Sequence, residues 1–291
     1  MVTIFVSAGA ALALLSVLIF FWLNRPKINK VDSLLPMGFE EEGFSHESFL
    51  RLLEQFVDVE GRVDYAAWHQ SKAAVTTLTR YIAAIQRYSP DNSPERFGSV
   101  TQQTTYWINA YNALVIFALL KRWPLASVLD VKAPIEAVKG MGFFYVQQHI
   151  VGGRAISLHA LEHKKLLEAG ADPRVHFLLN CGTGSCPMLR PISDNAVDME
   201  TLYKEAATAF VSDPEHVKID HSNKVITLSR IFKWYMEDFT KGQADQSSPR
   251  QRRLLSFIMS VAPFYLVTEL ERATSYQLKF KPFNWKVNAA T

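Results

Sequence analysis

An uncharged apolar run at the N-terminus places the strongest constraint on how this chain can fold. From Val2 to Leu23 the sequence carries no charged side chain, and about 20 apolar residues in a helix cross the hydrocarbon layer of a membrane. A cleaved signal peptide has a shorter apolar core, about 7–15 residues, and the chain continues here as NRPK without a small-residue cleavage site. We therefore expect residues 1–24 to form a single-pass transmembrane anchor, with the membrane contacted through residues 2–23.

The charges that flank this run predict its orientation. Arg25, Lys27 and Lys30 follow the apolar run, and no Lys or Arg precedes it. Because basic residues are enriched on the cytoplasmic side of a membrane, this pattern predicts that the rest of the chain faces the cytoplasm.

The remaining chain has the composition of an ordinary folded domain. Over the full 291 residues, 48% are hydrophobic and 20% are charged, and the formal net charge is +3. The basic residues are dispersed, so a nucleic-acid partner is not expected. Pro26, Pro36, Gly38 and Gly43 indicate a linker over residues 25–44, and we expect one globular domain over residues 45–286.

Periodicity predicts a mainly helical α+β domain with a small mixed or antiparallel sheet. The segment from Thr104 to Lys121 is apolar nearly all round, which is typical of a central buried helix. Further helices are expected over 45–56, 68–88, 157–170, 198–211, 229–239 and 250–262. Strands are expected over 143–151, 154–156 and 175–180, in a hairpin over 217–228, and in the C-terminal tail.

The two cysteines define the strongest candidate for a reactive centre. Cys181 and Cys186 lie in DPRVHFLLNCGTGSCP, residues 172–187. In a strand over 175–180 the side chains would alternate between faces, and the following glycine turn would return Cys186 to the edge of that strand. The residues of the turn, Gly182, Gly184 and Ser185, allow close backbone approach, so their N–H groups are candidates for an oxyanion site.

A cysteine nucleophile needs a base, because only the thiolate reacts. His176 on the same segment and His163 on the preceding helix are the candidates. Asp172, Glu162 or Asp238 could orient the imidazole, and the spacing does not choose between them. Asn180 lies beside Cys181 and is a candidate binding residue.

The same residues are compatible with non-catalytic uses. His159, Glu162 and His163 form H-x-x-E-H, the inverted zincin order, but no downstream residue is uniquely suited as a third ligand. Both cysteines with a histidine could hold a structural zinc, and a disulfide across the turn is equally allowed. We predict no catalytic metal site, and the sequence identifies no cofactor.

Two amides interrupt the apolar central helix. Asn109 and Asn112 lie three residues apart and therefore share one face. A buried amide without a partner costs roughly 1–3 kcal/mol, so both should be hydrogen-bonded. They either pin this helix to a neighbouring loop or hold the cysteine loop in place.

At these residues the sequence resembles the domain-of-unknown-function family 547 (DUF547) of bacteria and plants. The resemblance runs through GRVDYAAW (61–68), YWINAYNALV (106–115), VGGRAISLHALEH (151–163), residues 172–187 and LSRIFKWYMEDF (228–239). It implies that the family's motif positions are Asn109, Asn112, Glu162, His163, His176, Cys181, Cys186 and Pro187. His159 is not among them, which weakens the zincin hypothesis. Bacterial relatives look exported or envelope-bound, which implies the inner membrane and conflicts with the cytoplasmic orientation.

The family carries no established reaction, so the functional hypothesis comes from the residues. We expect a thiol-dependent hydrolase or acyl-transferase with Cys186 as nucleophile and His163 or His176 as base, acting on a small-molecule or peptide substrate. The alternative is a non-catalytic envelope or interaction module in which Cys181 and Cys186 form a disulfide or bind zinc.

Overall fold

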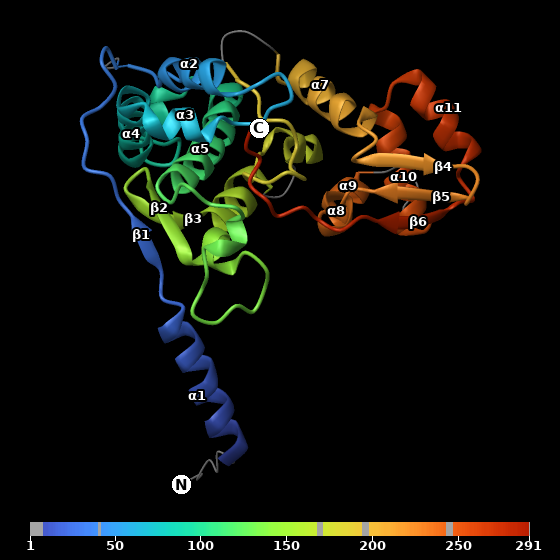
Figure 1. Ribbon diagram of the computed structural model, residues 1–291, viewed down its shortest axis with the longest axis horizontal. Helices are drawn as coiled ribbons and strands as arrows, with labels where there is room; N and C mark the ends of the chain where they lie inside the picture. The colour runs from blue at the N-terminus through green and yellow to red at the C-terminus, as the bar shows by residue number, and fades with distance from the viewer. Residues whose placement is uncertain (1–7, 40–41, 168–170, 194–197, 243–246, 291) are drawn as a thin grey trace.

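The chain folds into an α+β structure in which helices outnumber strands (Figure 1). The computed structural model describes residues 8–39, 42–167, 171–193, 198–242 and 247–290. The α-helices are α1 (Ala8–Leu23), α2 (Glu47–Phe56), α3 (Tyr65–Gln70), α4 (Lys72–Arg87), α5 (Val100–Leu120), α6 (Leu158–Leu161), α7 (Met199–Ser212), α8 (Arg230–Trp234), α9 (Met236–Lys241), α10 (Arg250–Val261) and α11 (Phe264–Arg272). The strands are β1 (Lys27–Asn29), β2 (Gln147–Val151), β3 (Arg154–Ser157), β4 (Val217–Asp220), β5 (Val225–Leu228) and β6 (Gln277–Phe280).

Short 3₁₀ and π-helical turns complete the structure. They are η1 (Pro94–Arg96), η2 (Val128–Asp130), η3 (Gly142–Val146), η4 (Glu162–Leu166) and η5 (Pro173–Leu178). Figure 1 shows α2–α5 with β1–β3 on one side of the molecule and α8–α11 with β4–β6 on the other. After β6 the chain returns to the first side, where isolated bridges join Val287 to Thr183 and Ala289 to Val63.

The predicted transmembrane anchor is wrong. In the described part of the chain, α1 has 16 residues, which at ~1.5 Å per residue span about 24 Å, less than the ~30 Å of a hydrocarbon core. No helix among the described residues is long and apolar enough to cross a membrane. The same finding overturns the predicted single-pass location in an inner membrane. Residues 2–7 of the predicted anchor lie outside the described residues.

Helix α5 is the central buried helix that the apolar pattern predicts. Ser99 caps it by accepting a hydrogen bond from the N–H of Gln102, and every residue from Thr105 to Ile116 is buried. Because it is apolar on all sides, α5 packs against neighbours all round, which include α3, α4 and α6.

Two small mixed sheets flank this core. In the first, β2 pairs antiparallel with β3 across the turn at Gly152–Gly153 and parallel with β1. Strand β1 lies within the predicted linker, so that segment is partly ordered as sheet. In the second, β4 and β5 form the hairpin predicted over 217–228, and β6 adds a parallel strand.

The strand predicted over 175–180 is instead the 3₁₀ helix η5. Asp172 caps this turn by accepting a hydrogen bond from the N–H of Arg174, and Pro173 occupies its first turn, both of which favour a helical start. The expected alternation of faces is therefore absent, and Val175, His176 and Leu178 are all buried.

Other elements are shorter or more broken than their patterns suggest. The strand predicted over 143–151 begins as η3 and becomes extended only in β2. The helix predicted over 68–88 divides at Ser71, which caps α4, and that over 229–239 divides at Tyr235. The helix predicted over 157–170 divides into α6 and η4, and its predicted end at Gly170 lies outside the described residues.

The burial of α5 makes the stability of the fold sensitive to its apolar side chains. Leu114 is fully buried in this helix, so Leu114→Ala should leave a cavity and lower the free energy of unfolding by about 2–5 kcal/mol. Val100 lies in the same helix but is 78% exposed, and Val100→Ala should change that free energy by less than about 0.5 kcal/mol. Urea unfolding followed by circular dichroism measures both. Equal effects would show that α5 is not the core helix.

Candidate functional site

A cavity of about 800 Å³ lies between the two sides of the molecule. Its walls come from α5, the η3–η4 region, the segment after η5, the α8–α9 pair and residues 282–285. It is lined by all four predicted catalytic residues, namely His163, His176, Cys181 and Cys186, and by Glu162. Residues far apart in the sequence therefore meet in one concave site, which is where ligands usually bind.

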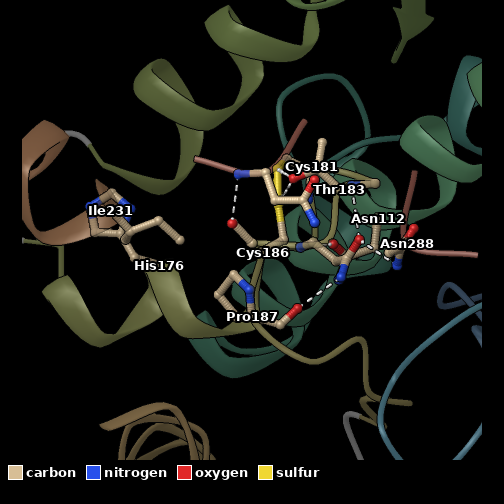
Figure 2. Close-up of a disulfide and its surroundings, with 12 residues drawn as sticks. Asn112, His176, Cys181, Thr183, Cys186, Pro187, Ile231 and Asn288 are labelled. Atoms are coloured by element: carbon tan, nitrogen blue, oxygen red, sulfur yellow. Dashed lines mark hydrogen bonds between the residues drawn. A yellow bond between two sulfur atoms is a disulfide. The ribbon is translucent and has the colours of Figure 1, made fainter. Parts of the chain in front are cut away.

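Cys181 and Cys186 are joined in a disulfide, with their Cα atoms 6.0 Å apart (Figure 2). Of the uses that the sequence left open for these cysteines, the disulfide is the one observed. In this form neither sulfur is a thiolate, so the pair supplies neither a nucleophile nor zinc ligands.

The two sulfur atoms have different surroundings. The backbone N–H of Cys181 donates a hydrogen bond to Sγ of Cys186 at 3.1 Å, and the Thr183 hydroxyl lies 3.2 Å from the same atom. Sγ of Cys181 lies 3.3 Å from that hydroxyl. Cys186 is thus the sulfur with two potential donors.

Asn112 connects the buried helix α5 to the segment that carries the cysteines. Its Nδ2 donates to the carbonyl of Leu178 at 3.0 Å, and its Oδ1 accepts from the N–H of Asn180 at 2.8 Å. Asn109, one turn earlier, donates to the carbonyl of Ile192 at 2.8 Å. Both amides therefore pin α5 to a loop, and this loop is the one that carries the disulfide.

Asn180 organises the interior of the cysteine loop, where Pro187 and Asn288 are labelled in Figure 2. Its Oδ1 accepts from the N–H of Gly182 at 2.8 Å and from Nδ2 of Asn288 at 3.2 Å, while its Nδ2 donates to the carbonyl of Pro187 at 2.8 Å. The N–H of Gly184 donates to the carbonyl of Lys286.

The predicted oxyanion donors are therefore already engaged within the structure. The N–H groups of Gly182 and Gly184 both have internal partners, and the hydroxyl of Ser185 accepts from the backbone N–H of Asn284. None of the three residues is part of the cavity lining. They hold the loop rather than face a ligand.

Asp238 is the carboxylate that orients His176. The side chain of His176 is 2% exposed, and its Nε2 lies 2.9 Å from Oδ2 of Asp238. This hydrogen bond holds the pKa of Asp238 below its usual value. Asp172, another candidate from the sequence, instead pairs with Arg174.

Glu162 is a second acidic group beside the same histidine and, unlike the half-buried Asp238, it is buried. Its Oε1 accepts a hydrogen bond from the hydroxyl of Tyr235 at 2.6 Å and lies 4.0 Å from Nδ1 of His176. Burial, followed by the charge of Glu162, raises the pKa of Tyr235 and also that of Tyr111, which hydrogen-bonds to Glu162. The imidazole of His176 thus lies between two carboxylates, one on each ring nitrogen.

His163 joins the site through ring contacts. It is exposed and stacks on His159 with ring centroids 4.1 Å apart, and His159 stacks on Tyr145 at 4.2 Å. Burial, and then the charge of His163, lowers the pKa of His159 to about 4. No group of three or more His, Cys, Asp or Glu side chains in the described residues is arranged to hold a metal ion, so the inverted zincin hypothesis gains no support.

Sequence reasoning missed several residues of the site. Tyr235 stands three residues before Asp238 in a motif singled out above, but nothing in the spacing connects it to Glu162. Thr183 and Asn288 act through contacts across the loop and from the C-terminal segment. An aromatic wall also lines the cavity, formed by Trp234, Phe283 and Trp285. Apart from Thr183, which contacts both neighbouring sulfurs, these residues have partners that are distant in sequence, so no short-range signal identifies them.

Comparison with known families confirms the resemblance seen in the sequence. The model of the family described as "Protein of unknown function, DUF547" matches residues 97–211. This segment contains Glu162, His163, His176 and both cysteines, whereas the motifs over 61–68 and 228–239 lie outside it. Neither the curated proteins nor the solved structures yield a match to the chain.

The hydrogen bonds of Asn112 predict that this side chain is essential for stability. Asn112→Ala leaves two buried backbone groups, on Leu178 and Asn180, without partners, so we expect a loss of about 2–4 kcal/mol in the free energy of unfolding. Gln103→Ala, a half-buried change in the same helix, should cost less than about 0.5 kcal/mol. Chemical denaturation of both variants measures this. Equal effects would mean that Asn112 does not hold the loop.

The lowered pKa of His159 predicts a loss of stability in acid. In the folded protein this pKa is about 4, below the ordinary histidine value of 6.5, so below pH 6.5 the unfolded chain binds more protons than the folded one. The contribution of neutral His159 to the free energy of unfolding is complete above pH 6.5 and is lost as the pH falls towards 4. The free energy of unfolding, measured from pH 7.5 to pH 4.5, should fall less steeply in His159→Gln than in the wild type. If the two proteins lost stability with equal steepness, burial of neutral His159 would not be a cause of the loss in acid.

Proposed function

We propose that this DUF547 protein is a thiol-dependent hydrolase or acyl-transferase whose nucleophile, Cys186, is held in a disulfide with Cys181 until it is reduced. The observation that carries the proposal is that one cavity is lined by both sulfurs, by the His176–Asp238 pair and by Glu162. A nucleophile, a base and an orienting acid in one concave site are the elements of covalent acyl transfer.

The surroundings of the sulfurs favour Cys186 as the nucleophile. Hydrogen bonds to the charged form of a group lower its pKa. After reduction, the N–H of Cys181 and the hydroxyl of Thr183 can both stabilise a thiolate on Cys186. Cys181 has only the hydroxyl of Thr183 within reach among the described residues, so it suits the role of the partner that forms the disulfide.

The loop has enough other contacts to keep its shape when the disulfide opens. Asn112, Asn180 and Asn288 connect it to α5, to Pro187 and to the C-terminal segment. A disulfide that closes so short a loop contributes only about 2 kcal/mol by restricting the unfolded chain. Its redox state can therefore change the chemistry of the site without dismantling it.

The reaction begins with reduction of the disulfide by a dithiol. The dithiol becomes a disulfide, and Cys181 and Cys186 each gain a proton. Cys186 then transfers its proton to His176 and attacks the acyl carbon of the substrate, forming a C–S bond. The bond to the leaving group breaks, and the leaving group takes the proton from His176.

Water completes the cycle in the hydrolase. His176 accepts a proton from water, the resulting hydroxide adds to the thioester carbon, and the C–S bond breaks to release the acid. The proton on His176 returns to Cys186. No hydrogen bond joins His176 to either sulfur in the described part of the chain, so a water or a polar atom of the substrate carries the proton between them. Asp238 keeps the imidazole oriented throughout.

Two serine variants test this assignment of roles, with hydrolysis of p-nitrophenyl acetate as the readout. Wild type should need dithiothreitol for activity. Cys181→Ser should be active without reductant because its Cys186 cannot form the disulfide. Cys186→Ser should be inactive with or without reductant, and His176→Asn should be slower by about a hundredfold or more.

Cysteine alkylation provides a readout that needs no substrate. In reduced protein, mass spectrometry should show Cys186 reacting faster than Cys181, with a pKa below the reference value of about 8.5. Equal alkylation rates together with equal activity of the two serine variants would refute the proposal.

The disulfide itself supports a second candidate, a non-catalytic module in which the pair only stabilises the loop. In that case Cys181→Ser and Cys186→Ser should lose similar stability, about 2 kcal/mol each, and neither should show thiol-dependent hydrolysis. The same variants therefore separate the two functions.

A further inference from the structure

The cavity has a second wall whose chemistry the acyl-transfer steps do not use. Trp234, Phe283 and Trp285 contact one another there with tilted rings, and the ring centroids are 4.7 Å apart for Trp234–Phe283, 4.7 Å for Phe283–Trp285 and 5.7 Å for Trp234–Trp285. Trp234 is 48% exposed although it is a large apolar side chain, and the other two rings are half-buried. Aromatic rings grouped inside a concave site are typical of surfaces that stack against a ligand.

Two cationic side chains lie beside this aromatic wall. Arg230 lines the cavity one helical turn before Trp234, and its Nε donates to the carbonyl of Lys281. Lys139 also lines the cavity, and the adjacent Gly140 lies close to Trp285, since a Cβ atom there would come within 3.6 Å of that ring. Neither cation forms an ion pair with a described carboxylate.

The acidic residues of the cavity are Glu162, Glu237 and Asp238. Glu162 is engaged with Tyr235, and Asp238 with His176. Glu237 is the remaining acid of the lining, and it belongs to α9 next to Asp238. The cavity therefore has an aromatic wall flanked by cations and a reactive wall that carries the carboxylates.

We infer that this cavity binds a ring-bearing organic anion, with its ring against Trp234, Phe283 and Trp285 and its anionic group on Arg230 and Lys139. A guanidinium binds carboxylate and phosphate groups through paired hydrogen bonds, and aromatic side chains offer a large apolar surface to a planar ring. The inference rests on the proposed function in one respect: the acyl group of such a ligand would face Cys186 and His176.

A set of three ligands with the same ring and different charges tests the inference. Indole-3-acetate is an anion, tryptophol is neutral and tryptamine is a cation. Isothermal titration of the full chain should show that indole-3-acetate binds about tenfold more tightly than tryptophol, and that tryptamine binds most weakly. The inference would be overturned if the three ligands bound with equal affinity or if indole-3-acetate did not bind detectably. It would also be overturned if tryptamine bound most tightly, because the cavity would then be a cation site.

Variants of the cavity test which side chains bind the anionic group of the ligand and which bind its ring. Arg230→Gln and Lys139→Gln should each weaken the binding of indole-3-acetate by about five- to tenfold and leave the affinity for tryptophol unchanged. Trp234→Ala should weaken the binding of both ligands. Lys233→Gln is the matched control, because Lys233 is exposed on the same short helix and is absent from the cavity lining. An unchanged affinity in Arg230→Gln and Lys139→Gln would also overturn the inference.

The double variant Cys181→Ser/Cys186→Ser separates this inference from the proposed function. It cannot perform thiol chemistry, yet it should bind indole-3-acetate as the wild type does. Binding without thiol-dependent hydrolysis in the wild type would leave the inference standing and refute the enzyme. Hydrolysis without selective binding of the anion would refute the inference alone.

Discussion

Asn112 lies where the buried helix α5 meets the cysteine loop, and its two hydrogen bonds set the position of that loop. An amide inside an apolar helix must find partners or lose roughly 1–3 kcal/mol, and the groups that it meets are the backbone of Leu178 and Asn180. Asn180 extends the network to Pro187 and to Asn288 from the C-terminal segment. The packing of the hydrophobic core therefore determines where both sulfurs face the cavity.

The same principle explains the reactive wall. Glu162 is buried, so it needs the hydroxyl of Tyr235 as a donor, and His176 is buried, so it needs the carboxylate of Asp238. These pairings hold the imidazole between two acids and prevent it from rotating. His176 therefore has one ring nitrogen hydrogen-bonded to Asp238, while the other lies 4.0 Å from Glu162.

The sequence predicted those elements that depend on residues close together in the chain. The apolar run of α5, the hairpin over 217–228 and the α+β class follow from periodicity and turn residues. The strand over 175–180 was mispredicted because Asp172 and Pro173 initiate a 3₁₀ turn, and this start signal outweighs a short apolar run. The anchor was mispredicted because the described helix in this run, α1, has 16 residues and is too short to cross a hydrocarbon core.

The site shows a similar division. The sequence identified Cys181, Cys186, His163 and His176, and the fold brings them to one cavity. It could not choose Asp238 over Asp172, because His176 and Asp238 are 62 residues apart and no spacing rule connects them. Nor could it decide between thiol, zinc and disulfide, since five-residue spacing permits all three.

The cavity combines residues from different parts of the chain. The segment that matches the DUF547 family, residues 97–211, supplies the sulfurs, Glu162 and His176. Asp238 and the aromatic wall lie C-terminal to it, and Phe283 and Trp285 reach the cavity because the segment after β6 returns to the first side of the molecule. A substitution at Trp234 or Arg230 leaves the hydrogen bonds of Asn112 and Asn180 untouched, so the ligand contacts on α8 can change without disturbing the loop that carries the disulfide.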